Sequence, residues 1–402
     1  MFRSLLEAAA EQQPDAVSLR RQIHAEPEVG NHLPLTRDKV LMALEGLPLD
    51  IRLNETTSGI VAIFGGDRTG PAIILRGDMD GLPLAEDTGL EFSSRSNTMH
   101  ACGHDLHTAM LVGAAGLLVD RTDQLAGPVV FMFQPGEESH HGARYMLEEG
   151  LLDVVSPRPT GAFALHVSAA YESGTVRHRP GAQMAAADQV TIVVTGRGGH
   201  ASSPHLALDP IAVAAEIVLA TQTAITRRID VFDPAVVTFG SIDAGTTHNV
   251  IPEAATLVGT IRTLSDATRA DVHRLLERVA TGVAAAHGAT ATVALDPGYP
   301  VSFNDTGFTA RVTEIASDLV GETAVVPLEA PIMGAEDWSY VLNEVPGMMT
   351  FIGACPSDLV PGEAPGNHSN LVRFDEGAMV VGMALLAAVA LDHCGITPAE
   401  PS

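Results

Sequence analysis

The nine residues MHACGHDLH, positions 99–107, concentrate side chains that bind metal ions or move protons. Cys102 and His104 are separated by one residue, so both can face one ion if the chain between them is extended or turning. A closed structural zinc site needs four Cys or His ligands, usually in paired spacings, and Cys355 and Cys394 have no neighbouring ligand pair. The C-x-x-C spacing of a redox site is also missing. The stretch is therefore either part of a larger site or a His-rich loop.

Two adjacent carboxylates follow the apolar run VVFMFQ. Glu137 and Glu138 lie in QPGEES, just after a Pro-Gly turn. Carboxylates held together repel each other unless a cation or a proton lies between them. A metal hydrolase needs one carboxylate that binds metal and another that takes a proton from the attacking water. The pair fits that need, and a solvated acidic pair is the alternative.

Further candidates stand alone in the sequence. His166 ends the apolar run FALHV, His368 lies in GNHSN, and Asp78 and Asp80 lie in GDMDG. A single histidine is often a satisfied core residue, and an aspartate at a strand end is often a turn cap; Asp80 could instead hold a ligand imidazole by its second nitrogen. Taken together, the candidates supply one Cys, three His and one Glu as ligands, with a second Glu as base. That set suits two divalent ions with an open position; a thiolate favours zinc, and carboxylates also admit manganese or cobalt.

The elements that must position these residues resemble an α/β domain. Apolar runs at 60–66, 72–80, 127–138 and 161–167 predict buried strands, and 107–120 predicts a helix. Strands alternating with helices predict a three-layer domain with a mostly parallel sheet. Functional groups gather beyond the carboxyl ends of such strands, which is where the acidic residues and His166 fall.

The pattern changes near residue 183. Strands are predicted at 189–196, 235–242, 254–264 and 289–296, with helices at 209–228 and 266–288. The order β-α-β-β-α-β predicts a ferredoxin-like α+β domain. We therefore expect a catalytic domain in two parts, 1–182 and 297–402, with an inserted domain at 183–296.

Composition excludes several classes of partner. The formal net charge is −26, so nucleic acid and anionic membrane surfaces are unfavourable partners. The start of the chain predicts an amphipathic helix with no signal peptide, and the apolar segment 378–395 predicts a core helix. Three widely spaced cysteines are typical of a reduced cytosol, so we expect a cytoplasmic protein.

A series of motifs along the chain has the order and spacing of a known family. They are LRRQIHAEPEVG, LRGDMDGLPLAEDTGL, MHACGHDLH, FMFQPGEE, ALHV, GRGGHASSPH, THNVIP, GTIRT, GAEDWSY and GNHSN. Over nearly its whole length the chain resembles the M20 metallopeptidases. It is most similar to the amidohydrolase branch, which includes N-acyl-amino-acid amidohydrolases, hippurate hydrolases and indole-acetyl-amino-acid hydrolases.

The resemblance implies a role for each matching residue. Glu137 is the general base and then the acid, and Asp80 is the carboxylate that orients the metal ligands. The wider family has a His at the position of Asp78, which leaves the role of Asp78 open. GNHSN also departs from the commoner form of the motif around the last ligand. The five metal ligands implied are Cys102, His104, Glu138, His166 and His368.

The resemblance also assigns residues of the inserted domain, which it implies is a lid and dimerisation domain. His200, in GRGGHASSPH, would polarise the scissile carbonyl, often in a partner subunit of a homodimer. Asn249 and Arg262 would hold the substrate carboxylate, and the planar fork of Arg suits that task. Exposed sheet edges in the inserted domain also favour association.

The implied activity is metal-dependent hydrolysis of an N-acyl amino acid to a carboxylate and a free amino acid. The nearer alternatives are other activities of the same family, namely a dipeptidase, a carbamoylase or a deacetylase of an N-acetylated intermediate. The alternative from another class is a metal-stabilised binding protein without catalysis.

Overall fold

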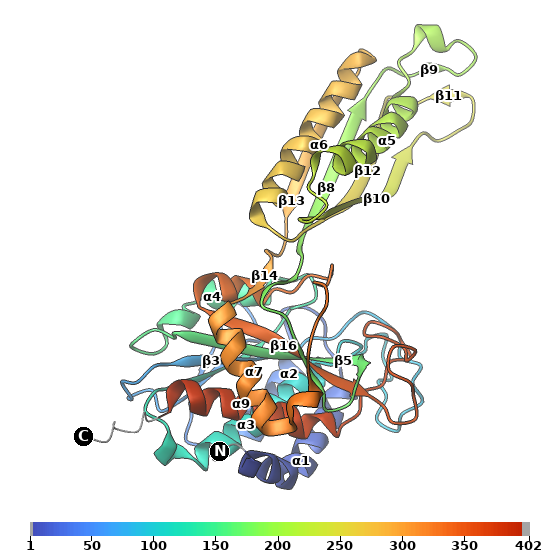
Figure 1. Cartoon of the computed structure of the whole chain (residues 1–402). Helices are drawn as coiled ribbons and strands as arrows, with labels where there is room; N and C mark the ends of the chain where they lie inside the picture. Colours follow the sequence, from blue (N-terminus) through green and yellow to red (C-terminus); the bar gives the residue numbers. More distant parts are fainter. Residues whose placement is uncertain (1–2, 396–402) are drawn as a thin grey trace. The chain divides into compact units, whose positions relative to one another are not determined.

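A computed structural model describes residues 3–395 of the chain, which divide into two compact units. Within that range, unit 1 comprises residues 3–181, 303–329 and 340–395, and unit 2 comprises residues 182–302 and 330–339. Figure 1 colours the chain by residue number, so the three parts of unit 1 and the two parts of unit 2 can be followed. Residues 1–2 and 396–402, the ends of the predicted first and last domains, lie outside the described residues.

An eight-stranded sheet forms the centre of unit 1. The pairs β4–β3, β3–β5 and β5–β16 at its middle are parallel. All residues of β2, β3, β4 and β16 are buried, as expected for strands covered on both faces. This confirms the predicted buried strands of an α/β fold. In spatial order the strands are β1 (Asp50–Leu53), β2 (Ile60–Phe64), β4 (Val129–Gln134), β3 (Ile73–Asp78), β5 (Gly161–Glu172), β16 (Gly347–Cys355), β6 (Val176–His178) and β15 (Val325–Pro327).

One predicted strand runs in the opposite direction to the parallel centre. β2 pairs with β4 antiparallel, and β1 pairs with β2 antiparallel. Only residues 65–72 separate β2 from β3, and they contain no helix. A parallel return needs a crossover of a dozen or more residues, so this short connection reverses the chain direction.

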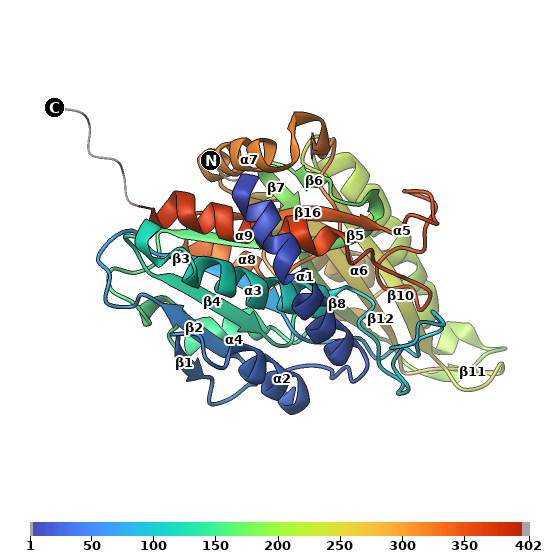
Figure 2. The same ribbon diagram turned by 90° about the horizontal axis from the view of Figure 1, so that it is seen from below.

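Helices cover the sheet of unit 1 on both sides. α1 (Arg3–His24), α3 (His104–Val119), α7 (Thr306–Val320) and α9 (Ala378–Cys394) pack together on one face. α4 (Gly142–Glu148) packs against β4, and Figures 1 and 2 place it on the other side. α2 (Pro34–Leu44) packs beside α1, and α8 is the short helix Ser339–Glu344.

The apolar segment near the end of the chain is a core helix, as predicted. α9 is buried on nearly all sides and belongs to the main hydrophobic cluster of unit 1. Among the helices of residues 3–395, none has the length and apolar character needed to cross a membrane.

Unit 2 contains a four-stranded antiparallel sheet in the order β10-β12-β8-β13. Two helices, α5 and α6, pack against each other and against this sheet around one apolar core. Asp209 caps α5 and Ser265 caps α6, since each side chain accepts a hydrogen bond from a backbone N–H of the first turn. The order β-α-β-β-α-β is the predicted ferredoxin-like one. The elements are β8 (Ala186–Thr195), α5 (Pro210–Arg228), β10 (Ala235–Ala244), β12 (Ala254–Thr263), α6 (Asp266–Ala286) and β13 (Thr290–Pro297).

Four further short strands lie outside these two sheets. β9 (Gly199–His200) pairs antiparallel with β11 (Val250–Ile251) in unit 2. β7 (Gly181–Met184) and β14 (Ser302–Asn304) lie where the chain passes between the units. The segment 330–339 belongs to unit 2, where Ile332 bridges Met184.

Candidate metal centre

A glycine turn places the first two candidate ligands. Gly103 has a φ of 88°, and a Cβ built there would lie 2.3 Å from a side-chain carbon of Val167. Only glycine fits this turn without strain. It puts Cys102 just before α3 and His104 at the first position of the helix, three residues earlier than the pattern predicted.

The cysteine thiol lies between two histidines from distant parts of the chain. The Sγ atom of Cys102 is 3.4 Å from Nε2 of His166 and 3.3 Å from Nε2 of His368. Nε2 of His368 is also 3.1 Å from Oε1 of Glu138. His166 lies on β5 just past the last β3–β5 pair, which joins Arg76 to Ala164. Four of the predicted ligands thus come together at the sulfur atom.

The five predicted ligands fall into two groups that share Cys102. One group is Cys102, His104 and His166, and the other is Cys102, Glu138 and His368; the ligand atoms of each lie within 4.8 Å of one another. Nε2 of His104 and Oε1 of Glu138 are both buried, and each faces another candidate side chain, Oδ2 of Asp78 at 3.3 Å and Nε2 of His368 at 3.1 Å. A shared soft sulfur with buried imidazole and carboxylate groups around it fits two borderline divalent ions.

Asp80 organises the predicted ligands from behind. Its Oδ1 is 3.3 Å from Nδ1 of His104, which leaves Nε2 for a metal. The two Asp80 oxygens also accept the backbone N–H groups of Glu137 and Glu138, each at 3.0 Å. The side chain of Glu137 is 5% exposed. Asp80 therefore fixes both His104, a predicted ligand, and the turn that carries the candidate base.

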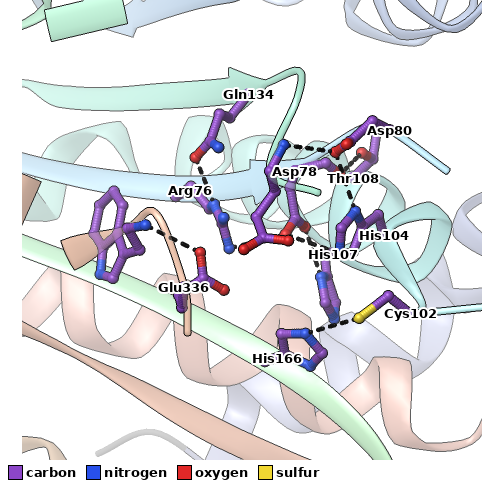
Figure 3. A network of polar contacts seen from close by, with 12 residues as sticks. Arg76, Asp78, Asp80, Cys102, His104, His107, Thr108, Gln134, His166 and Glu336 are labelled. Atoms are coloured by element: carbon purple, nitrogen blue, oxygen red, sulfur yellow. Dashed lines mark hydrogen bonds and ion pairs between the residues drawn. The ribbon is translucent and has the colours of Figure 1, made fainter. Parts of the chain in front are cut away.

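Asp78, whose role the sequence leaves open, is held by three basic side chains. Oδ1 lies 2.6 Å from Nδ1 of His107, and Oδ2 lies 2.9 Å from the Arg76 guanidinium and 3.3 Å from Nε2 of His104. Burial would raise the pKa of Asp78, but the charges of Arg76, His104 and His107 outweigh burial and lower it. Figure 3 shows this cluster. Asp78 is thus ionised and oriented, and it supports His104 and His107.

The charges at the sulfur atom favour a cation. Hydrogen bonds with Cys102 and Glu138 raise the pKa of His368 to about 10. Burial would raise the pKa of Glu138, but the hydrogen bond from His368 and the charge of His104 lower it. A metal competes with protons for such ligands, so this site is one from which metal binding releases protons.

A second buried network anchors the start of α3. Oδ2 of Asp105 is 2.7 Å from Nε of Arg20 and 2.8 Å from Nδ1 of His24, both on α1. Nε2 of His24 is 3.2 Å from Glu86. The sequence motifs alone do not predict these contacts.

The structure brings two of the three predicted unit 2 residues together. His200 pairs with Val250 in the β9–β11 ladder, and the carbonyl of Asn249 accepts the N–H of Ala201. Both lie beyond the end of β8, whose last residue pairs with Ala254. Arg262 lies near the other end of β12, half-buried, and donates to the carbonyl of Ile261 at 3.0 Å. His200 and Asn249 are therefore far from Arg262 within one chain.

The fold, the motifs and the ligand groups define a family. The chain belongs to Peptidase family M20/M25/M40, whose sequence pattern matches residues 74–392. Its similarity to the relatives named below places it among the amidohydrolases of that family.

Three similar proteins illustrate the match. The IAA-amino acid hydrolase ILR1-like 2 of Arabidopsis thaliana is 35% identical over 94% of this chain and 84% of its own. The N-acetylcysteine deacetylase of Bacillus subtilis (strain 168) is 36% identical over 93% of this chain and 96% of its own. The solved Bacillus subtilis YXEP protein, described as a dinuclear metal binding peptidase from the M20 family, has a TM-score of 0.82. It is 32% identical and covers 96% of this chain and 99% of its own.

Proposed function

We propose that this protein hydrolyses the amide bond of N-acyl amino acids, releasing a carboxylate and a free amino acid. The observation that carries the proposal is the pair of ligand groups sharing Cys102, with Glu137 held on the same turn as Glu138. Relatives named for acyl-amino-acid hydrolysis, at 35–36% identity over most of the chain, support this substrate class.

The proposed metal ligands are Cys102, His104, Glu138, His166 and His368, which together would hold two divalent ions. When bound, such ions polarise the substrate carbonyl and lower the pKa of the attacking water. The thiolate makes zinc the first candidate, and the carboxylate also admits manganese or cobalt.

Glu137 carries the protons in this proposal. It takes a proton from the attacking water and later gives that proton to the leaving nitrogen. Its backbone is fixed by Asp80, and its side chain is buried, so the carboxylate is shielded from bulk solvent. Asp80 contributes by orienting His104 and the turn rather than by touching substrate.

Residues of unit 2 would complete the site by binding substrate. We assign His200 to the scissile carbonyl and Asn249 and Arg262 to the substrate carboxylate. Arg262 and Ala254 are eight positions apart on β12, about 27 Å at roughly 3.4 Å per residue, and His200 lies beyond the Ala254 end. A small substrate cannot reach all three in one chain, which supports a homodimer in which the partner supplies His200 and Asn249. Light scattering that finds only monomer at assay concentration would contradict this assignment.

The three cysteines are free and buried, which supports a reducing compartment, and we propose the cytoplasm.

The test of the function is a substrate panel with added zinc, manganese or cobalt. We expect hydrolysis of hippurate or N-acetyl amino acids to exceed that of N-carbamoyl amino acids and dipeptides. A preference for carbamoyl substrates or dipeptides would replace the proposed activity with another one of the family. No hydrolysis of any substrate by metal-loaded protein would indicate a binding protein instead.

Two neighbouring variants separate the base from the ligand. Glu137→Gln should keep both metals and lower kcat about 10²–10⁴-fold, because only proton transfer is removed. Glu138→Gln should weaken metal binding itself, since a ligand oxygen is lost. Metal content by atomic emission and kcat on the best substrate are the measurements. Wild-type turnover by Glu137→Gln would refute the mechanism.

A further inference from the structure

Asn367, next to the proposed ligand His368, binds two other segments of the metal site. Its side-chain amide donates to the carbonyl of Cys102 at 3.1 Å and to the carbonyl of Val167 at 3.0 Å. Its side-chain oxygen accepts the N–H of Ala169 at 3.3 Å. All three hydrogen bonds of this half-buried amide thus go to the chain around the proposed ligands.

The carbonyl of Val167 connects these hydrogen bonds of Asn367 to His166. Nδ1 of His166 is 2.8 Å from that same carbonyl, so the ring donates its Nδ1–H there and keeps Nε2 free for a metal. The N–H of Val167 in turn donates to Nε2 of His107 at 2.8 Å. The peptide groups of Val167 therefore determine the orientation of His166, and Asn367 holds one of them.

His368 itself has an unusual backbone conformation. Its φ is 70°, a left-handed conformation that a non-glycine residue rarely adopts. Its N–H donates to the carbonyl of Ala101 at 2.9 Å, and its side chain is about half exposed. Such a conformation persists only where neighbouring contacts hold it, and the three side-chain hydrogen bonds of the adjacent Asn367 are among them.

From these contacts we propose that Asn367 is a positioning residue of the metal centre, which aligns Cys102, His166 and His368 from three separate segments before metal binds. The inference rests on the ligand set of the proposed function. It predicts that metal affinity, rather than the proton transfer by Glu137, depends on Asn367.

The test compares Asn367→Asp with Asn370→Asp in the full chain. Both change one asparagine of the same loop to a carboxylate, and the Asn370 side chain makes no hydrogen bond within the described residues. In Asn367→Asp the amide donors become acceptors facing two carbonyl oxygens. Loss of a partner behind a metal ligand typically weakens metal binding about 10–100-fold. We expect that loss for Asn367→Asp and wild-type affinity for Asn370→Asp.

The readout is titration of metal-stripped protein with Co²⁺ against a competing chelator, followed through the thiolate-to-cobalt absorption band that reports Cys102. Wild-type affinity and an unchanged band in Asn367→Asp would overturn the proposal, and so would equal weakening in Asn370→Asp. If Asn367→Asp does not fold, Asn367→Ala removes the donors without adding charge, and it should weaken Co²⁺ binding about tenfold or more.

A third variant separates this inference from the ligand assignment. His368→Ala should weaken Co²⁺ binding, and adding Asn367→Asp to it should cost less than in the wild type, because the two residues act together. If His368→Ala binds Co²⁺ normally, the proposed ligand set is wrong. If His368→Ala is weakened and Asn367→Asp is not, only the role of Asn367 is refuted.

Discussion

Replacing Arg20 by Met should remove one partner of a buried ion pair that anchors α3. The side chains of Arg20 and Asp105 are 1% and 0% exposed, and Nε lies 2.7 Å from Oδ2. At that distance the attraction is about 6 kcal/mol for an effective dielectric constant of about 20. Removing one partner of such a buried pair typically lowers the free energy of unfolding by about 3–5 kcal/mol. Because His24 stays 2.8 Å from the same oxygen, we expect about 3 kcal/mol for Arg20→Met.

Arg21→Met is the matched control. Both guanidinium groups lie over the ring of Phe92, at 4.7 and 4.9 Å, and both bind Glu376. Arg21 is half exposed and makes no ion pair with Asp105 in the described structure, so its replacement should cost about 0–1 kcal/mol. The difference between the two variants therefore isolates the buried pair.

The difference should also depend on pH. Burial would raise the pKa of Asp105, but the charges of Arg20 and His24 outweigh it and lower the pKa below the ordinary value of 3.8. A carboxyl group with a lowered folded-state pKa stabilises the fold above its unfolded pKa and loses that contribution as the pH falls. Arg20→Met removes the main cause of the lowering, so Asp105 takes up a proton at higher pH. The difference in unfolding free energy between wild type and Arg20→Met is then largest near neutral pH and smaller in acid.

The assay is urea unfolding of metal-free protein, followed by far-ultraviolet circular dichroism at about pH 7 and about pH 4. Metal-free protein is used so that loss of metal at low pH does not enter the comparison. Equal destabilisation by Arg20→Met and Arg21→Met would refute the reasoning, and so would a gap that does not change with pH.

Two predictions concern unit 2, whose unfolding can be followed by the fluorescence of Trp338, the single tryptophan of the chain. Leu276→Ala, in the buried core, should cost about 2–5 kcal/mol, whereas Leu219→Ala, at an exposed position, should stay within about 0.5 kcal/mol; equal costs would contradict the assigned core. Ser265→Ala removes the oxygen that accepts the N–H of Thr268 and should cost about 1 kcal/mol in urea unfolding. An unchanged midpoint would mean that the cap adds no stability.

Much of the fold follows from local patterns in the sequence. The apolar runs that predict β2, β3 and β4 are buried strands because each is long enough to cross a sheet covered on both faces. The alternating burial of β8 and β12 likewise matches a sheet with one face on a core. The hydrophobic pattern that predicts each of these elements lies within its own consecutive residues.

Other features have no local signal. The segment 330–339 belongs to unit 2 although it lies beyond the predicted end of the inserted domain, and it lacks any periodic pattern. The strands β6 and β15 span only three residues each, too few for a pattern to register. Their positions depend on pairing with strands elsewhere in the chain, which no short window of sequence contains.

The candidate site likewise contains residues that the sequence predicts and contacts that it does not. The ligands and Glu137 could be proposed because metal-binding residue types recur in recognisable motifs. The contacts of Asp78 with Arg76 and His107, and of Asn367 with Cys102, could not, because each depends on atoms that only the fold brings together. Asn367 and Cys102, for example, are 265 positions apart.

The pairing of β5 with β16 also has a consequence for how the chain acquires its structure during synthesis. Ala162 pairs with Gly347, about 185 residues later, and unit 2 is made in between. At about 5–20 residues per second on the ribosome, roughly 10–40 s pass between the synthesis of β5 and that of its second neighbour, β16. During that interval one edge of a buried, apolar strand has no partner, and such an edge invites pairing with other chains. The nascent chain is thus expected to depend most on chaperones after unit 2 has emerged and before β16 is made.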